Sequence, residues 1–154
     1  MNFSLKSISS LLVFIFISFT LISCSKDEPL SPTEEHFEAE GVVFYQSGTK
    51  IVEIFRGVTQ DTFFVPVNGL TPTIEVRFLN PNKQEILPPD YKKQPMSWEI
   101  VDTSLVSVRQ NAGEEGSYKF QFSGKNNGIT QVEFFILHEG HPDFRSGKIP
   151  VRVR

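Results

Sequence analysis

Cysteine is nearly absent from this 154-residue chain, which contains one, Cys24. A single cysteine forms no intramolecular disulfide, and if its sulfur is used elsewhere no thiolate remains as a metal ligand. Methionine is almost as scarce, because Met96 is the only one after the first residue. We therefore expect the fold to depend on its hydrophobic core, and the shortage of sulfur ligands disfavours a Cu(I) site.

Excess positive charge is also missing. The chain has 15 basic and 18 acidic residues, a formal net charge of −3, and no basic cluster longer than Lys92-Lys93. Proteins that bind nucleic acids usually present a basic patch. No nucleic-acid partner is expected.

Helical patterns and catalytic motifs are the remaining absences. No window of about ten residues or more combines helical spacing of apolar residues with capping residues. The chain contains no nucleophile elbow, phosphate-binding loop or established catalytic signature. The sequence therefore favours a β protein that is not an enzyme.

The N-terminus has the pattern of an export signal. Lys6 is followed by an apolar run over residues 11–22, which is shorter than the roughly 20 residues of a membrane span. The run ends at Ser23-Cys24, where a small residue precedes a thiol that can act as a nucleophile. We predict a signal peptide over residues 1–23.

Leu21-Ile22-Ser23-Cys24 resembles the signal of bacterial lipoproteins, which implies cleavage before Cys24 and acylation of its sulfur. Several acyl chains hold a protein firmly to a membrane, because each buried methylene contributes about 0.8 kcal/mol. Ser25-Lys26-Asp27-Glu28 resembles the export signal of surface lipoproteins in the Bacteroidota. The resemblance implies a protein anchored by lipid in the outer membrane, at the cell surface or facing the periplasm.

Two regions follow the signal. Residues 24–40 are rich in Pro, Ser and Glu and predict a flexible tether. Residues 41–154 predict one all-β domain, with short apolar runs between turn residues. Ile74, Val76 and Phe78 alternate with polar residues, as in a half-buried strand. Seven to nine such short strands predict an antiparallel β-sandwich.

The stretch from Trp98 to Val108 resembles bacterial immunoglobulin-like (Big) domains, in which a tryptophan precedes an Asp-containing turn and a Val-Ser-Val strand. Gly128-Ile129-Thr130-Gln131-Val132 is similar to a later strand of the same family. The resemblance implies an immunoglobulin-like β-sandwich with an adhesive, spacer or carbohydrate-associated role.

One loop departs from that family pattern and gathers metal-binding residue types. His138, His141 and Asp143 lie close together around a predicted turn, so their side chains are expected to converge. Two imidazoles and a carboxylate suit a divalent transition metal such as zinc, copper or iron. Glu139, water or His36 would supply a fourth ligand.

A purely structural role for the same loop stays open. Asp143 would then bind backbone amides of the loop, while His138 packs at the end of the sheet. A metal-dependent hydrolase would further need a general base, for which Glu133 and Glu139 are the nearby candidates.

The sequence therefore leads first to a non-catalytic, lipid-anchored envelope protein that presents loops to a protein or glycan partner. The alternative is a lipoprotein that captures or delivers a transition metal through the loop over residues 138–143.

Overall fold

The computed structural model describes residues 36–154, which form strands and no helix. The predicted signal peptide, Cys24 and most of the predicted tether lie outside the described residues. Within residues 36–154 no helix is long and apolar enough to cross a membrane.

The described chain contains eleven strands. In chain order they are β1 (Gly41–Gln46), β2 (Thr49–Phe55), β3 (Phe63–Val65), β4 (Ile74–Leu79), β5 (Glu85–Ile86), β6 (Met96–Ile100), β7 (Val106–Arg109), β8 (Lys119–Gly124), β9 (Gly128–His138), β10 (His141–Arg145) and β11 (Ile149–Val153).

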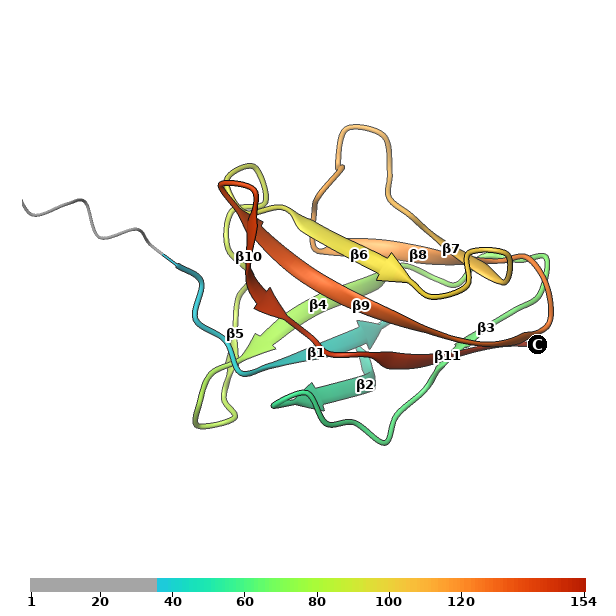
Figure 1. Cartoon of the computed structure of the whole chain (residues 1–154), viewed down its shortest axis with the longest axis horizontal. Coiled ribbons are helices and arrows are strands. Elements are labelled where there is room, and N and C mark those ends of the chain that lie inside the picture. The colour runs from blue at the N-terminus through green and yellow to red at the C-terminus, as the bar shows by residue number, and fades with distance from the viewer. Residues whose placement is uncertain (1–35) are drawn as a thin grey trace, which may run out of the picture. The chain divides into compact units, whose positions relative to one another are not determined.

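The strands form two sheets, which Figure 1 shows as two layers. One sheet has the order β2-β1-β4-β8-β7, with β5 paired to β4. The other has the order β10-β9-β11-β3, with β6 paired to β9. The predicted all-β sandwich is confirmed. Two details differ from the prediction: the described residues contain eleven strands instead of seven to nine, and β3 pairs with β11 in parallel.

Alternating apolar residues close the space between the sheets. Ile74, Val76 and Phe78 are buried as predicted, and so are Phe120 and Phe122 on β8. Phenylalanine rings from both sheets meet edge to face or tilted, with Phe44, Phe63, Phe120, Phe122 and Phe134 in one connected group. Each fully buried ring contributes about 1.5–3 kcal/mol relative to an exposed one. This core fixes the positions of the strand ends.

The long strand β9 organises one end of the sandwich. One of its edges pairs with β6, and its other edge pairs first with β11 and then with β10. The break between β10 and β11 is bridged by Ser146, whose hydroxyl accepts a hydrogen bond from the Phe134 amide at 2.9 Å. The β9–β10 hairpin extends to the end of the sandwich at which the described chain begins (Figure 1).

Residues 36–40, here called the N-terminal segment, pack against that end. The Phe37 ring lies 4.9 Å from the Phe78 ring, centroid to centroid, and the Glu40 amide donates to the Leu79 carbonyl at 2.8 Å. The sequence placed these residues in the tether, because the polar composition of residues 24–40 outweighs one phenylalanine. In the structure they contact the sandwich before β1 begins at Gly41.

Candidate metal centre

A two-residue turn sets His138 opposite His141. Glu139 and Gly140 both have positive φ, 48° and 87°, the signature of a type I′ hairpin turn. The residues on either side of the turn pair directly across the hairpin, His138 with His141. Cross-strand partners project from the same face of a sheet, so the turn delivers both imidazoles to one side.

A β-bulge adds Asp143 to the same place. Pro142 pairs with Leu137 and Phe144 pairs with Ile136, which leaves Asp143 without a partner across the hairpin. An extra residue of this kind re-aims the side chains around it. Phe144 thereby faces the core with Ile136, and the Asp143 side chain is also buried, with 2% of its surface exposed.

The third imidazole comes from the other end of the described sequence. His36 lies 107 positions before Asp143, yet its Nδ1 is 2.9 Å from Asp143 Oδ1. The amide of Phe37 donates to Asp143 Oδ2 at 3.2 Å. The N-terminal segment therefore completes the cluster.

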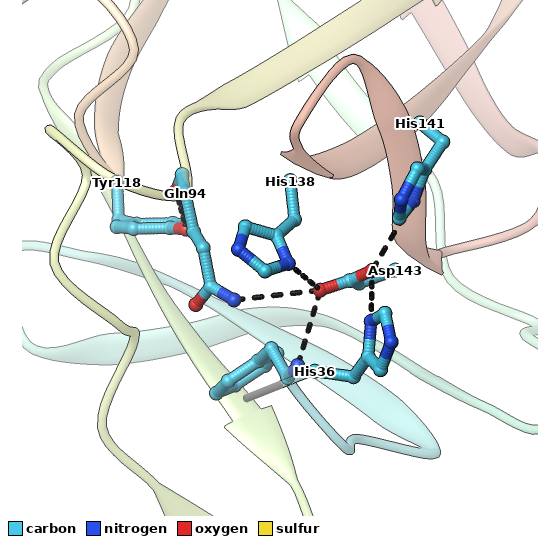
Figure 2. A network of polar contacts seen from close by, with 7 residues as sticks. His36, Gln94, Tyr118, His138, His141 and Asp143 are labelled. Carbon is cyan, nitrogen blue, oxygen red and sulfur yellow. Dashed lines mark hydrogen bonds and ion pairs between the residues drawn. The ribbon is translucent and has the colours of Figure 1, made fainter. Parts of the chain in front are cut away.

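The Asp143 carboxylate is surrounded by nitrogen atoms (Figure 2). Besides His36 and the Phe37 amide, His141 Nδ1 lies 3.5 Å from Oδ1, and His138 Nδ1 and Gln94 Nε2 each lie 3.4 Å from Oδ2. Burial by itself raises the pKa of Asp143, but the hydrogen bonds from His36 and the Phe37 amide and the charge of the imidazoles outweigh it. The pKa is therefore below its ordinary value. The group is an ionised carboxylate at neutral pH.

His138 carries the clearest sign of a ligand. Its Nδ1 is buried and, among the described residues, has no hydrogen-bond partner, although it lies 3.4 Å from Asp143 Oδ2. Buried polar atoms without a partner are rare and call for an explanation. Adjacent ligand atoms on a tetrahedral zinc ion with bonds of about 2.1 Å lie roughly 3.4 Å apart. The His138–Asp143 contact, an ion pair in the structure, therefore has a separation that also suits two ligands of one metal.

Three residues point their potential ligand atoms toward one another. His36, His138 and Asp143 each offer a ligand atom, and these atoms lie within 4.8 Å of one another. The His141 ring lies 5.9 Å from that of His36 and 6.2 Å from that of His138, centroid to centroid. His141 therefore lies beside the convergent group, with its Nδ1 3.5 Å from Asp143 Oδ1.

A buried support lies behind the carboxylate. Gln94 is 8% exposed and directs its amide to Asp143. The Tyr118 hydroxyl donates to the backbone carbonyl of Gln94 and so holds that residue in place. Burial, with a smaller contribution from the charge of Asp90, raises the pKa of Tyr118, so the hydroxyl keeps its proton. Partners of this kind orient metal ligands in known sites.

Some of the ligands that the sequence proposed lie in the cluster and others do not. It brings His138, His141 and Asp143 together and adds His36, which the sequence offered as one fourth ligand. Glu139 does not join, because it occupies the exposed turn. No local pattern pointed to Gln94 or Tyr118, since neither stands next to the histidines in sequence.

Glu133 is also outside the cluster. Val132, Phe134 and Ile136 are buried, so the side chain of Glu133 leaves β9 on the opposite face. There it lies 3.9 Å from Arg145. A general base for metal-dependent hydrolysis is therefore missing from the candidates that the sequence named.

Comparisons with known proteins found a similar solved structure and no matching family. No protein-family model and no curated protein matches the chain. Among solved structures, domains 4 and 5 of the S-layer protein SbsC match with a TM-score of 0.41 and 13% identity, over 75% of this chain and 54% of that chain. The match thus spans about half of that structure and carries no inference about function. The lipoprotein and Big-domain resemblances remain predictions from the sequence.

Proposed function

We propose that the chain is a non-catalytic cell-envelope protein, anchored by lipid on Cys24, whose domain binds a divalent transition metal. The ligands are His36, His138 and Asp143, with His141 as the fourth. The observation that carries this proposal is the buried Nδ1 of His138, which makes no hydrogen bond among the described residues and lies 3.4 Å from a buried carboxylate.

The donor set selects the class of metal. Imidazole nitrogen and carboxylate oxygen suit zinc, Cu(II), Ni(II) and Fe(II), whereas Mg²⁺ and Ca²⁺ prefer oxygen alone. Met96 is buried in the core and offers no soft ligand. Four protein ligands would fill a tetrahedral site, as in zinc sites that do no chemistry. The site therefore supports capture or delivery of the metal over hydrolysis.

The test is a titration of the purified full-length chain, without a histidine tag, with Zn²⁺ and Cu²⁺ and with Mg²⁺ as the control ion. The matched variant is His138→Gln/His141→Thr. It places on the β9–β10 turn the residues that flank the similar turn between β1 and β2, Gln46 and Thr49.

Wild type is expected to bind one zinc or Cu²⁺ ion per chain and no Mg²⁺. Loss of an outer-shell partner alone costs about 10- to 100-fold in metal affinity, so the double variant is expected to lose more than about 100-fold. Equal, millimolar or weaker binding in both proteins would overturn the proposal.

A second candidate function is supported by a cleft of about 390 Å³, which shares Tyr118 with the support of the metal site. Tyr91 and two prolines, Pro88 and Pro89, line it together with the charged side chains of Arg77 and Glu114. A cleft of this size, with an aromatic ring and polar groups in its lining, suits a small organic ligand. We propose a glycan partner here. Loss of binding to envelope polysaccharide fragments in Tyr91→Ala, measured by NMR titration, tests it, and no binding by wild type contradicts it.

A further inference from the structure

We infer that the metal acts as a clasp, which closes the N-terminal segment onto the β9–β10 hairpin, so that metal affinity and the position of this segment control each other. The inference rests on the proposed metal site. It adds a regulation: displacement of the segment releases the metal.

The site is incomplete without the N-terminal segment. His36 is one of the three residues whose ligand atoms converge within 4.8 Å, and the other two, His138 and Asp143, belong to the β9–β10 hairpin. A metal held by all three necessarily joins the segment to the hairpin. No other described residue of the segment offers a donor to the cluster except the Phe37 amide, which already binds Asp143.

The contacts that hold the segment without a metal lie mainly at its inner end, next to β1. It precedes β1, so no sheet pairing begins before Gly41. Its other contacts are the Phe37–Phe78 ring contact, the packing of Ala39 against the core, and the contacts of Glu40. The Glu40 amide donates to the Leu79 carbonyl, the Glu40 carbonyl accepts from the Arg56 amide at 2.7 Å, and the Glu40 carboxylate pairs with Arg56. The His36 side chain is 48% exposed. Segments that lie outside the paired strands and are partly exposed open locally while the rest of the fold persists.

Thermodynamic linkage determines how much a bound metal suppresses opening of the segment. A ligand that binds only the closed form suppresses opening by a factor of one plus its concentration divided by Kd, about 100-fold at 100 times Kd. Because the hairpin keeps His138, His141 and Asp143 when the segment opens, some affinity remains. The suppression is then limited to the ratio of the affinities with and without His36.

The same coupling runs in the other direction. Whatever factor the metal contributes to closing the segment, holding the segment away weakens metal binding by that factor. The segment connects the sandwich to the predicted lipid anchor at Cys24. A partner that binds the connecting chain and displaces the N-terminal segment would therefore weaken metal binding. Such a release is what delivery of the metal requires.

Hydrogen exchange on the full-length chain tests the clasp, with zinc as the probe. The reporting amides are those of Phe37 and Glu40, which donate to Asp143 and Leu79. Amides of the β1–β2 hairpin serve as an internal reference. His36→Ala removes the ligand, and Glu38→Ala, an exposed position in the same segment, is the matched control.

Zinc is expected to slow exchange of the two reporting amides by about tenfold or more in wild type and Glu38→Ala, without changing the reference amides. In His36→Ala this protection is expected to vanish, and zinc affinity to fall by about tenfold or more. Zinc binding with unchanged exchange at the reporting amides, or with wild-type affinity in His36→Ala, would overturn the clasp and leave the metal site standing. Absence of zinc binding in wild type would overturn both.

Discussion

The molecule contains two hairpins with the same backbone design and different chemistry. In the β1–β2 hairpin the turn residues Ser47 and Gly48 have φ of 50° and 77°, and in the β9–β10 hairpin Glu139 and Gly140 have 48° and 87°. In each hairpin the residues beside the turn pair directly, and the third residue after the turn lacks a cross-strand partner. That unpaired residue is Ile51 in one hairpin and Asp143 in the other.

The two hairpins differ in their side chains, and the N-terminal segment contacts the second hairpin. Gln46 and Thr49 flank the first turn, and Ile51 packs against the hydrophobic core. His138 and His141 flank the second, and the bulged residue is a carboxylate that also receives the N-terminal segment. A common template thus yields a plain hairpin in one place and a ligand cluster in another. The turn and bulge supply the geometry, and four side chains supply the chemistry.

The largest effect is expected at the bulged residue of the second hairpin. Asp143→Ala leaves the Phe37 amide without its acceptor, which costs about 1–3 kcal/mol of unfolding free energy, and it also removes a metal ligand. Denaturant unfolding without metal measures the first loss and zinc titration the second. A variant as stable as wild type that still binds zinc would contradict the account of Asp143.

Replacement of the turn glycine is expected to destabilise the two hairpins equally. Gly48→Ala and Gly140→Ala each force a side chain into the left-handed region, at a cost of about 1–2 kcal/mol, and neither new methyl group meets another atom within 4 Å. Equal losses in thermal or denaturant unfolding of the metal-free chain would confirm that the turns share one geometry. Losses that differ by more than about 0.5 kcal/mol, beyond the usual scatter between independent sites, would show that they do not.

The reverse graft asks whether a pair of histidines is sufficient. Gln46→His/Thr49→His builds the imidazole pair on the first hairpin, where Ile51 occupies the bulge in place of a carboxylate. The new pair is expected to bind zinc at least about 100-fold more weakly than the native site, because two ligands are missing. Equilibrium dialysis at low zinc should still give one ion per chain. Two ions bound with similar affinity would show that Asp143 and His36 are dispensable.

The smallest effect concerns pH and the first hairpin. The hydrogen bond from Lys50, with a second from Lys83, lowers the pKa of Glu53 below its ordinary value of 4.5. A lowered pKa contributes stability that is present above the ordinary value and is lost as pH falls through the lowered one. Because these ion pairs are largely exposed, the contribution is below about 1 kcal/mol. Glu53→Gln should flatten the decline of stability in that acidic range, and an unchanged acid profile would contradict the assignment.

Most of the fold could be predicted from local patterns of apolar and polar residues. Alternation at Ile74, Val76 and Phe78 is a property of neighbouring residues, so it reveals a half-buried strand without any structure. The parallel pairing of β3 with β11 joins residues 63–65 to residues 151–153, and no local pattern records such a contact. Strand β5 has two residues, which are too few to show an alternating pattern in the sequence.

The candidate site divides in the same way. His138, His141 and Asp143 could be grouped in advance because one turn and its bulge bring them together. His36 was only an alternative, since its contact with Asp143 spans 107 positions and depends on Phe37 packing against Phe78. Gln94 and Tyr118 enter from two other parts of the sandwich, so only the tertiary structure reveals them.

X-ray absorption at the zinc edge, on the full-length untagged chain loaded with one equivalent of zinc, tests the central claim most directly. The account predicts a first shell of nitrogen and oxygen without sulfur, with the outer-shell scattering that imidazole rings produce. That imidazole signal should weaken in His138→Gln/His141→Thr, which retains His36 as its one imidazole ligand. A first shell of water oxygens alone in wild type, or an identical spectrum in the variant, would contradict it.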